Sequence, residues 1–352
     1  HDHSFRVPEP YLTLQLGTPN TCNQCHDDKG AQWAVDALEA WGVSSRPRAA
    51  HAPVLSAAWS GQVAALPALL SLASQTSAPA ILRASALQAS QNIPARETLE
   101  ALQQPLASDD PLVRLAAVQS MDWVPLAQRY AMLRDLIPDP YKSVRMAVAR
   151  QLSQFPADQL PGSSATELQA LFREYVESLK FNSDMPDGLM NLALFYSATG
   201  DPLKAEQTYR KALKLSPAFV PALLNLADLY RANGMDQQAE PLLRQAIELA
   251  PSSAHPSHAL GLLLIRQKKL QESLPYLRTA AESGSSNYRY PYVYAVALWE
   301  SGQRDSAIQT LESALEQFPG NRELLSALAS YYQQTGDTEK LRKLTEQYAQ
   351  PQ

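Results

Sequence analysis

The chain has 352 residues, of which 45% are hydrophobic, so it is long enough for two or three domains and can bury a core. Its formal net charge of −5 argues against nucleic acid as a main partner, and no apolar run of about 18 residues predicts a membrane span. With 26 prolines against 13 glycines, the composition favours many short helices over glycine-rich turns between strands.

Both cysteines of the chain fall in one pentapeptide, Cys22-Asn-Gln-Cys25-His26. This Cys-x-x-Cys-His pattern is the attachment signature of c-type haem. Thiols three positions apart can reach both vinyl groups on one edge of a porphyrin, and the adjacent histidine can bind the iron as its proximal ligand. We therefore predict one covalently attached haem c on Cys22 and Cys25, with His26 on the iron.

Three other uses of this motif stay open. The two thiolates could hold zinc together with two of His1, His3 and His26, since two thiolates and two imidazoles suit tetrahedral zinc. The pair could also be a redox dithiol, although no βαβ context for one is visible, or a structural pair, free or bridged.

The second iron ligand has to come from outside the motif. The first methionine that follows is Met121, far along the chain, whereas His3, His1 and His51 are nearer. We therefore predict bis-histidine ligation, with His3 or His1 as candidates and His51 as an alternative, or a histidine from another subunit. Such an iron has no open position, which favours electron transfer. His51 could instead cap or pack the helix that follows it.

Residues 27–41 predict a helix directly after the motif, with two aspartates at its start and a glycine after its end. One stripe of it is apolar: Trp33, Ala37, Leu38 and Trp41. We expect these tryptophans to cover a haem face or to pack on the rest of the chain. Arg6 and Lys29 are candidate partners of the haem propionates. Residues 1–50 are thus expected to form a small haem-binding segment.

Residues 51–160 carry a weak repeat. Arg83, Arg114 and Arg145 are each 31 positions apart, and each is preceded by a proline-containing helix start and followed by small apolar residues. This pattern resembles a short array of HEAT-type repeats. We expect the arginine column to be structural, binding neighbouring aspartates or carbonyl groups.

From Met185 onward the chain repeats every 34 residues. Small residues recur at Ala212, Ala246, Ala280 and Ala314, and glycines at Gly200, Gly234, Gly302 and Gly336. The third unit has Lys268 where the others have glycine. The pattern resembles tetratricopeptide repeats, so we predict about four stacked helical hairpins and a truncated fifth. A joint at 161–166 would separate the two arrays, so that the second occupies 161–352.

Six side chains are expected on the inward-facing helices of the second array and are candidates for protein binding: Asn191, Asn225, Asp228, Arg231, His258 and Trp299. Matching asparagines could bind a peptide backbone. The alternative is a hydrated polar face with no partner.

The order of these pieces resembles exported bacterial multihaem c-type cytochromes that carry HEAT-like and tetratricopeptide repeats. The resemblance lies in the stretches 1–10 and 16–20, in Cys22 to Lys29, and in Trp33. It implies a periplasmic or extracellular protein and a distal ligand at His3. This chain departs from the family in having one haem motif where members usually have several.

The sequence therefore predicts an all-α protein, an α-solenoid with a small haem-binding segment before it. Two functions fit. One is an electron-transfer cytochrome whose scaffold docks a redox partner or copies of itself. The other is a structural or filament-forming subunit in which the haem acts as a clasp. No pattern of catalytic residues stands out, so we do not expect an enzyme.

Overall fold

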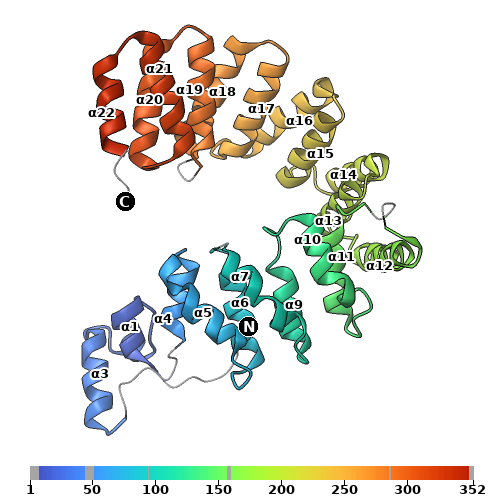
Figure 1. The fold of residues 1–352 in the computed structure, drawn as a ribbon, viewed down its shortest axis with the longest axis vertical. Coiled ribbons are helices and arrows are strands. Elements are labelled where there is room, and N and C mark those ends of the chain that lie inside the picture. The colour runs from blue at the N-terminus through green and yellow to red at the C-terminus, as the bar shows by residue number, and fades with distance from the viewer. Residues whose placement is uncertain (1–7, 44–50, 94, 157–159, 285–286, 349–352) are drawn as a thin grey trace. The chain divides into compact units, whose positions relative to one another are not determined.

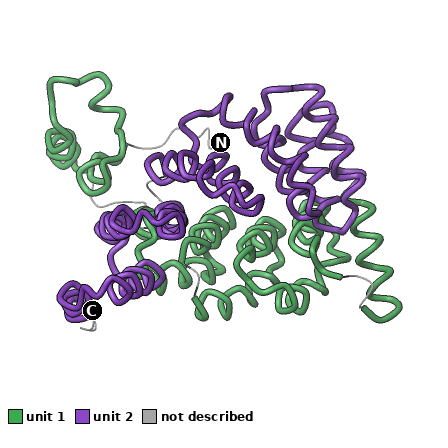
Figure 2. The backbone as a smooth tube through the Cα atoms, turned by 90° about the horizontal axis from the view of Figure 1, so that it is seen from above, with its two compact units in different colours: residues 1–175 green, residues 176–352 purple. Residues whose placement is uncertain are grey.

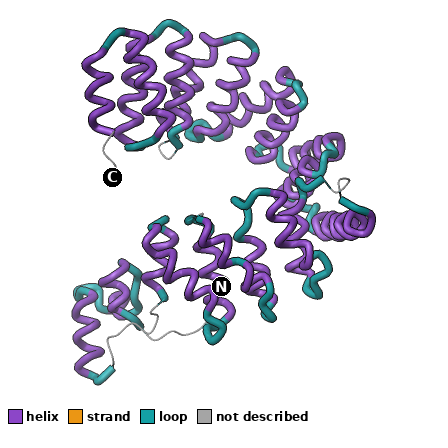
Figure 3. Tube along the Cα trace, in the orientation of Figure 1, coloured by secondary structure: helices purple, strands orange, loops and turns teal. Residues whose placement is uncertain are grey.

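Figure 1 shows the computed structural model of the chain, which describes all residues except 1–7, 44–50, 94, 157–159, 285–286 and 349–352. Every regular element in this described part is a helix, as Figure 3 shows, and this confirms the predicted all-α fold. The chain divides into two compact units, residues 1–175 and 176–352 (Figure 2). The predicted site residues His1, His3 and Arg6 lie outside the described residues.

The first unit begins with three short helices and continues as an array of packed helices. Its elements are α1 (Pro10–Leu16), α2 (Cys22–Cys25), α3 (Ala31–Ala40), α4 (Ala52–Trp59), η1 (Val63–Ala65), α5 (Leu66–Ser74), α6 (Ala80–Ser90), α7 (Arg96–Ala101), α8 (Gln103–Leu106), α9 (Pro111–Gln119), α10 (Leu126–Leu133), η2 (Arg134–Leu136), α11 (Lys142–Leu152) and α12 (Gly162–Phe181). One apolar core runs from Leu55 to Leu171. Alanines on successive helices let the backbones approach closely, so the array buries a continuous core that no single pair could bury alone.

The predicted arginine column is structural. Arg83 Nε donates to the carbonyl of Ala73 at 3.1 Å. Arg145 forms a bidentate pair with Glu174, its Nε and Nη2 donating at 2.9 and 2.6 Å. This pair lowers the pKa of Glu174, because the arginine hydrogen bond favours the carboxylate. Arg83 therefore ties α6 to α5, and Arg145 ties α11 to α12.

Arg114 is the buried member of this column. Its Nε and Nη2 donate to the two carboxylate oxygens of Asp139 at 2.8 and 3.2 Å. A further nitrogen, Nη1, donates to the carbonyl of Ser108 at 2.7 Å. Arg114 is 8% exposed and Asp139 5% exposed, so both charges are taken out of water and satisfied by each other.

The boundary between the arrays differs from the predicted one. The segment 161–166 was expected to be a joint, but α12 begins at Gly162 and runs unbroken to Phe181. Leu168 and Leu171 belong to the core of the first unit, which extends to residue 175. Proline, glycine, serine and threonine are common at helix starts as well as in loops. Their presence alone could therefore not distinguish the start of a helix from a loop.

The second unit is a row of helical hairpins. Its helices are α13 (Pro186–Ala198), α14 (Pro202–Leu215), α15 (Val220–Ala232), α16 (Asp236–Leu249), α17 (Ala254–Arg266), α18 (Leu270–Ser283), α19 (Arg289–Glu300), α20 (Arg304–Gln317), α21 (Arg322–Thr335) and α22 (Thr338–Tyr348). Each helix packs mainly on the one before and the one after it. The repeated alanines at 212, 246, 280 and 314 are buried at these contacts. The last hairpin has both helices, where a truncated unit was predicted.

The hairpin turns explain the glycine column. Gly200, Gly234 and Gly302 have φ of 80, 72 and 85°, a left-handed conformation that suits glycine. Lys268, which replaces glycine in the third unit, has φ of 62° and is the one non-glycine residue with positive φ among the described residues. The packing of α17 on α18 therefore holds a lysine in a backbone conformation it does not prefer.

The second unit ends on a polar helix. Charged side chains cover α22, where Lys343 pairs with Glu339 and Arg342 with Glu346. The exposed face of α22 is therefore polar. Among the described residues, no helix is long and apolar enough to cross a membrane.

Candidate functional site

The cysteine motif forms one turn of helix. Cys22 and Cys25 are the first and last residues of α2, and the amide of His26 donates to the carbonyl of Cys22 at 3.0 Å. Both thiols are free; Cys22 is half-buried and Cys25 exposed, as is His26. The turn therefore presents both sulfurs and the imidazole from one short segment.

Two asparagines hold this turn. The side chain of Asn20 is buried and donates to Thr13 Oγ1 at 3.0 Å, which fastens the motif to α1. Asn20 Oδ1 accepts from the amide of Asn23 at 3.2 Å, and the two side chains bond at 2.8 Å. Asn23 Nδ2 donates onward to the carbonyl of Lys29 at 2.7 Å. The loop on both sides of the cysteines is thus fixed by the side chains of Asn20 and Asn23.

The helix after the motif starts later than predicted. Residues 27–30 form a turn, and α3 begins at Ala31 with Gly30 before it. The predicted tryptophan stripe is not the buried face: Ala34 and Val35 are buried, whereas Trp41 is 75% exposed. Contacts with α1 and α2 decide which face of α3 is covered, and these contacts are not visible in the periodicity.

Trp33, a predicted haem-contacting residue, lies beside the motif. Its ring centroid is 4.7 Å from that of His26, with the planes tilted by 53°. Trp33 is 36% exposed, and Tyr11 and Leu14 on α1 are also exposed. The module of α1, α2 and α3 therefore leaves aromatic and aliphatic side chains uncovered near an accessible pair of thiols.

These features fit a covalently attached haem. The thiols are free and stand on one helical turn next to an accessible imidazole. Uncovered apolar side chains of the same module could meet a porphyrin face. Cys22 and Cys25 would hold the group through thioethers and His26 would bind its iron.

The second iron ligand is not assigned by the described residues. His51 is half-buried directly before α4, and its carbonyl accepts from the amide of Leu55 at 3.0 Å. Its side chain makes no capping hydrogen bond to α4, so the capping role considered for it is not realised. His1 and His3 lie outside the described residues. Within the described part of the chain, no three His, Cys, Asp or Glu side chains are grouped to hold a metal ion.

The six candidate groove residues fall into two groups. Asn191 is exposed, Asn225 donates to the carbonyl of Pro221 in its own helix at 2.7 Å, and Trp299 stacks on Tyr331 with ring centroids 3.8 Å apart. The Asn225 bond uses one of the two hydrogens of its side-chain amide. A protein-binding role of these three residues stays a prediction.

The other three come together in one pocket. Asp228, Arg231 and His258 line a cavity of about 330 Å³ between α15, α17 and α19. Sequence reasoning missed Arg266 and Arg289, which line the same cavity. A signal was present, because His255 and Arg289 occupy the same repeat position 34 residues apart.

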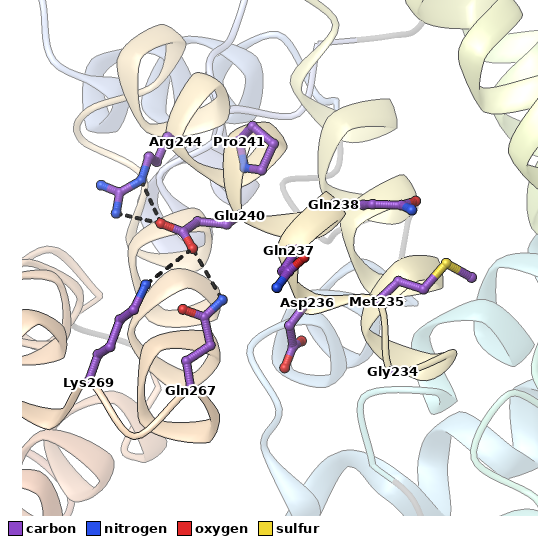
Figure 4. A pocket seen from close by; sticks show the side chains of 10 residues that line it. All are labelled: Gly234, Met235, Asp236, Gln237, Gln238, Glu240, Pro241, Arg244, Gln267 and Lys269. Atoms are coloured by element: carbon purple, nitrogen blue, oxygen red, sulfur yellow. Dashed lines mark hydrogen bonds and ion pairs between the residues drawn. The ribbon is translucent and has the colours of Figure 1, made fainter.

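A second, more open hollow of about 880 Å³ lies along α16 (Figure 4). Glu240 is at its centre and accepts from Arg244 at 2.7 Å and from Gln267 at 3.1 Å, with Lys269 at 3.9 Å. These bonds, led by that from Arg244, lower the pKa of Glu240. The charge of Glu240 is thus already satisfied by neighbouring side chains. These contacts join α16 to the turn between α17 and α18.

Each of the two units contains an array of helical repeats, and the two arrays are of different kinds. Residues 66–153 match HEAT repeats, and residues 184–252, 224–288, 264–331 and 298–349 match tetratricopeptide repeats. Both predicted repeat types are confirmed. The cysteine motif lies before the first of these matches.

Several solved structures are similar over about half of the chain. The MamA protein is 22% identical, with 46% of this chain and 89% of that one covered and a TM-score of 0.42. YrrB, a tetratricopeptide-repeat protein with an unusual peptide-binding site, is 20% identical, with 49% and 89% covered and a TM-score of 0.41. PilW, a type IV pilus biogenesis factor, is 23% identical, with 46% and 76% covered and a TM-score of 0.39. Among curated proteins, no match was found.

Proposed function

We propose that the chain is an exported c-type cytochrome that carries one covalent haem and docks protein partners through its repeats. The observation that carries this proposal is the Cys22–His26 turn, in which two free thiols and an accessible imidazole share one helical turn. When bound, the haem supplies one-electron chemistry. The role is electron transfer and binding rather than catalysis.

The chain's own residues have distinct parts in this proposal. Cys22 and Cys25 would hold the haem through thioether bonds, and His26 would bind its iron. Asn20 and Asn23 fix the turn that presents these three side chains. A second imidazole, from His3, His1 or His51, would complete the coordination.

The compartment follows from the attachment chemistry. Covalent attachment of haem to thiols takes place outside the cytoplasm, so the proposal places the protein in the periplasm or outside the cell. Its partner would be a redox protein or another copy of the chain, bound by the repeats.

The test is a haem stain after denaturing electrophoresis, together with oxidised and reduced absorption spectra of the protein made with the haem-attachment machinery. The proposal expects a stain that survives denaturation and a low-spin reduced spectrum. A Cys22→Ser/Cys25→Ser variant should lose the stain, while Ser326→Ala, on the exposed surface of α21 in the second unit, should keep it. Absence of haem from the unaltered protein, with zinc bound in its place, would contradict the proposal.

A second function is favoured by the small core of the N-terminal module. In α1 to α3, Pro10, Ala34 and Val35 are the buried apolar residues, while Trp41 and Leu14 are exposed. A haem could therefore act mainly as a structural clasp, since so small a core contributes little stability. If the clasp joins two subunits, dilution to the monomer should abolish the low-spin spectrum. An electron carrier with both ligands in one chain should keep it.

A further inference from the structure

The pocket between α15, α17 and α19 has an unusual combination of charge and apolar surface. Three arginines and one aspartate are among its lining residues, so its walls carry excess positive charge. Its floor is apolar, with Leu224, Leu243 and Leu263 from α15, α16 and α17. A ligand that fits would carry negative charge beside an apolar group.

Two of the arginines already have partners. Arg231 Nε donates to Asp228 at 3.1 Å. Arg266 makes a bidentate pair with Asp236 at 2.8 and 3.1 Å. Removing either arginine would therefore disturb contacts within the repeat array as well as the pocket.

Arg289 is the uncompensated charge. It stands at the start of α19 with an exposed side chain, and no described residue pairs with its guanidinium. One free arginine matches a single carboxylate in charge and in its fork of donors. A phosphate dianion would leave one negative charge unmatched in a pocket that also contains Asp228.

His258 offers a second donor beside it. Its Nδ1 is buried without a hydrogen-bond partner, and its ring contacts Tyr290 with centroids 4.8 Å apart. Burial first, then the charges of His255 and Arg289, lower the pKa of His258 to about 4, so the ring is neutral at pH 7. With Nδ1 buried and unpartnered, Nε2 is the nitrogen left to meet a ligand, and a neutral ring that is protonated there can donate a hydrogen bond.

We propose that this pocket binds an acidic side chain, Asp or Glu, of an extended protein segment that carries an apolar residue next to it. Arg289 and His258 Nε2 would hold the carboxylate, and the leucine floor would take the apolar neighbour. The walls come from three successive first helices of the repeats, so an extended chain lying across them meets each in turn. A volume of about 330 Å³ suits one or two side chains rather than a folded domain. The proposal rests on the scaffold role of the repeats and is independent of the haem.

The experiment uses the full chain and four mixed libraries of fluorescent peptides with acetylated and amidated ends. Their fixed central pairs are Glu-Leu, Gln-Leu, Lys-Leu and phosphoserine-Leu, and the other positions vary. Fluorescence anisotropy should show the Glu-Leu library bound about tenfold more tightly than the Gln-Leu library, as expected when a charge-assisted hydrogen bond is lost. Equal binding of these two, or a preference for phosphoserine, would overturn the proposal.

Matched arginine variants locate the contact. Arg289→Gln should remove the preference for Glu, whereas Arg278→Gln, which deletes the same charge from the exposed face of α18, should keep it. His258→Phe, which preserves ring packing on Tyr290, should weaken Glu-Leu binding severalfold. If both arginine variants weaken binding equally, the attraction is general and the pocket is not the site. The Cys22→Ser/Cys25→Ser chain should bind peptides unchanged, so failure of the haem proposal would not affect this result.

Discussion

Arg114 Nε lies 2.8 Å from Asp139 Oδ2, and the two side chains form a nearly buried bidentate pair in the first unit. Removing the arginine leaves the aspartate charged and out of water. We expect Arg114→Met to lower the free energy of unfolding by about 3–5 kcal/mol. Denaturant unfolding followed by circular dichroism measures this loss.

The control is an arginine with a similar partner in solvent. Arg96 pairs with Glu100, and both side chains are exposed. Because exposed pairs contribute about 1 kcal/mol or less, Arg96→Met should change the stability little. Equal effects of the two substitutions would show that the buried pair has no special role.

Lys268 predicts a stabilising substitution. Its φ of 62° costs a residue with a Cβ about 1–2 kcal/mol relative to glycine. Substituting glycine would remove this cost, but part of the gain in stability is offset by the greater conformational freedom of glycine in the unfolded chain. We expect Lys268→Gly to raise the free energy of unfolding by about 0.5–1 kcal/mol, seen as a higher midpoint in denaturant.

The converse change at Gly302 provides the comparison. Its φ is 85°, and a Cβ built there meets nothing within 4 Å, so the effect of alanine would come from the backbone alone. Gly302→Ala should destabilise the second unit by about 1 kcal/mol. A destabilising Lys268→Gly would mean that the lysine side chain itself stabilises the turn.

Asn23 is expected to control how the cysteines are presented. Asn23→Ala removes the bond to the Lys29 carbonyl and the contact with Asn20, so the turn loses two of its fastenings. We predict a lower haem-to-protein ratio, measured by absorption against protein mass, with the repeats unaffected. Asn233→Ala removes an asparagine that bonds within α15 and should leave the ratio unchanged. Full haem loading of Asn23→Ala would rule out this positioning role.

His258 should make the second unit sensitive to acid. Its folded-state pKa of about 4 lies below its ordinary value of 6.5. As the pH falls, the unfolded chain therefore binds the proton first, and unfolding becomes easier. The contribution of neutral His258 to the free energy of unfolding is complete above pH 6.5. It is lost as the pH falls toward 4.

Two measurements check this sign. An NMR titration of the His258 ring should give a pKa well below that of a free imidazole, and Arg289→Gln should raise it by removing a nearby positive charge. Denaturant unfolding between pH 7 and 4 should show less pH dependence in His258→Phe than in the unaltered chain. A ring that titrates near 6.5 would contradict the buried environment.

The repeats were predictable because their signals recur. Ala212 and its equivalents recur because a small residue is needed wherever two helices of the stack touch. Lys268, the exception in the glycine column, still lies in a turn, as the other members of the column predict. The arginine column was also predictable, since Arg83 and its equivalents fill the same position in successive units. In each case several positions of the sequence indicated the same local structure.

Features that occur once were harder to predict. The start of α12 resembles a loop because the residues that begin a helix also make turns. Trp41 was expected to cover a haem face or to pack on the rest of the chain, and amphipathic spacing could not tell that no described neighbour covers it. The pocket joins His258 to Arg289 from different repeats, and their proximity depends on how α17 and α19 pack.

The nearest-neighbour packing of the hairpins has a consequence for changes in chain length. Since each helix of the second unit contacts mainly the one before and the one after it, a whole hairpin can be removed or duplicated without altering the contacts within the others. An insertion of 34 residues would meet the same buried alanine and the same left-handed turn on either side. An insertion of a few residues inside a helix would instead rotate its apolar face out of the stack. The array can therefore grow or shrink in whole hairpins, and the distance spanned by its binding surface changes in the same steps.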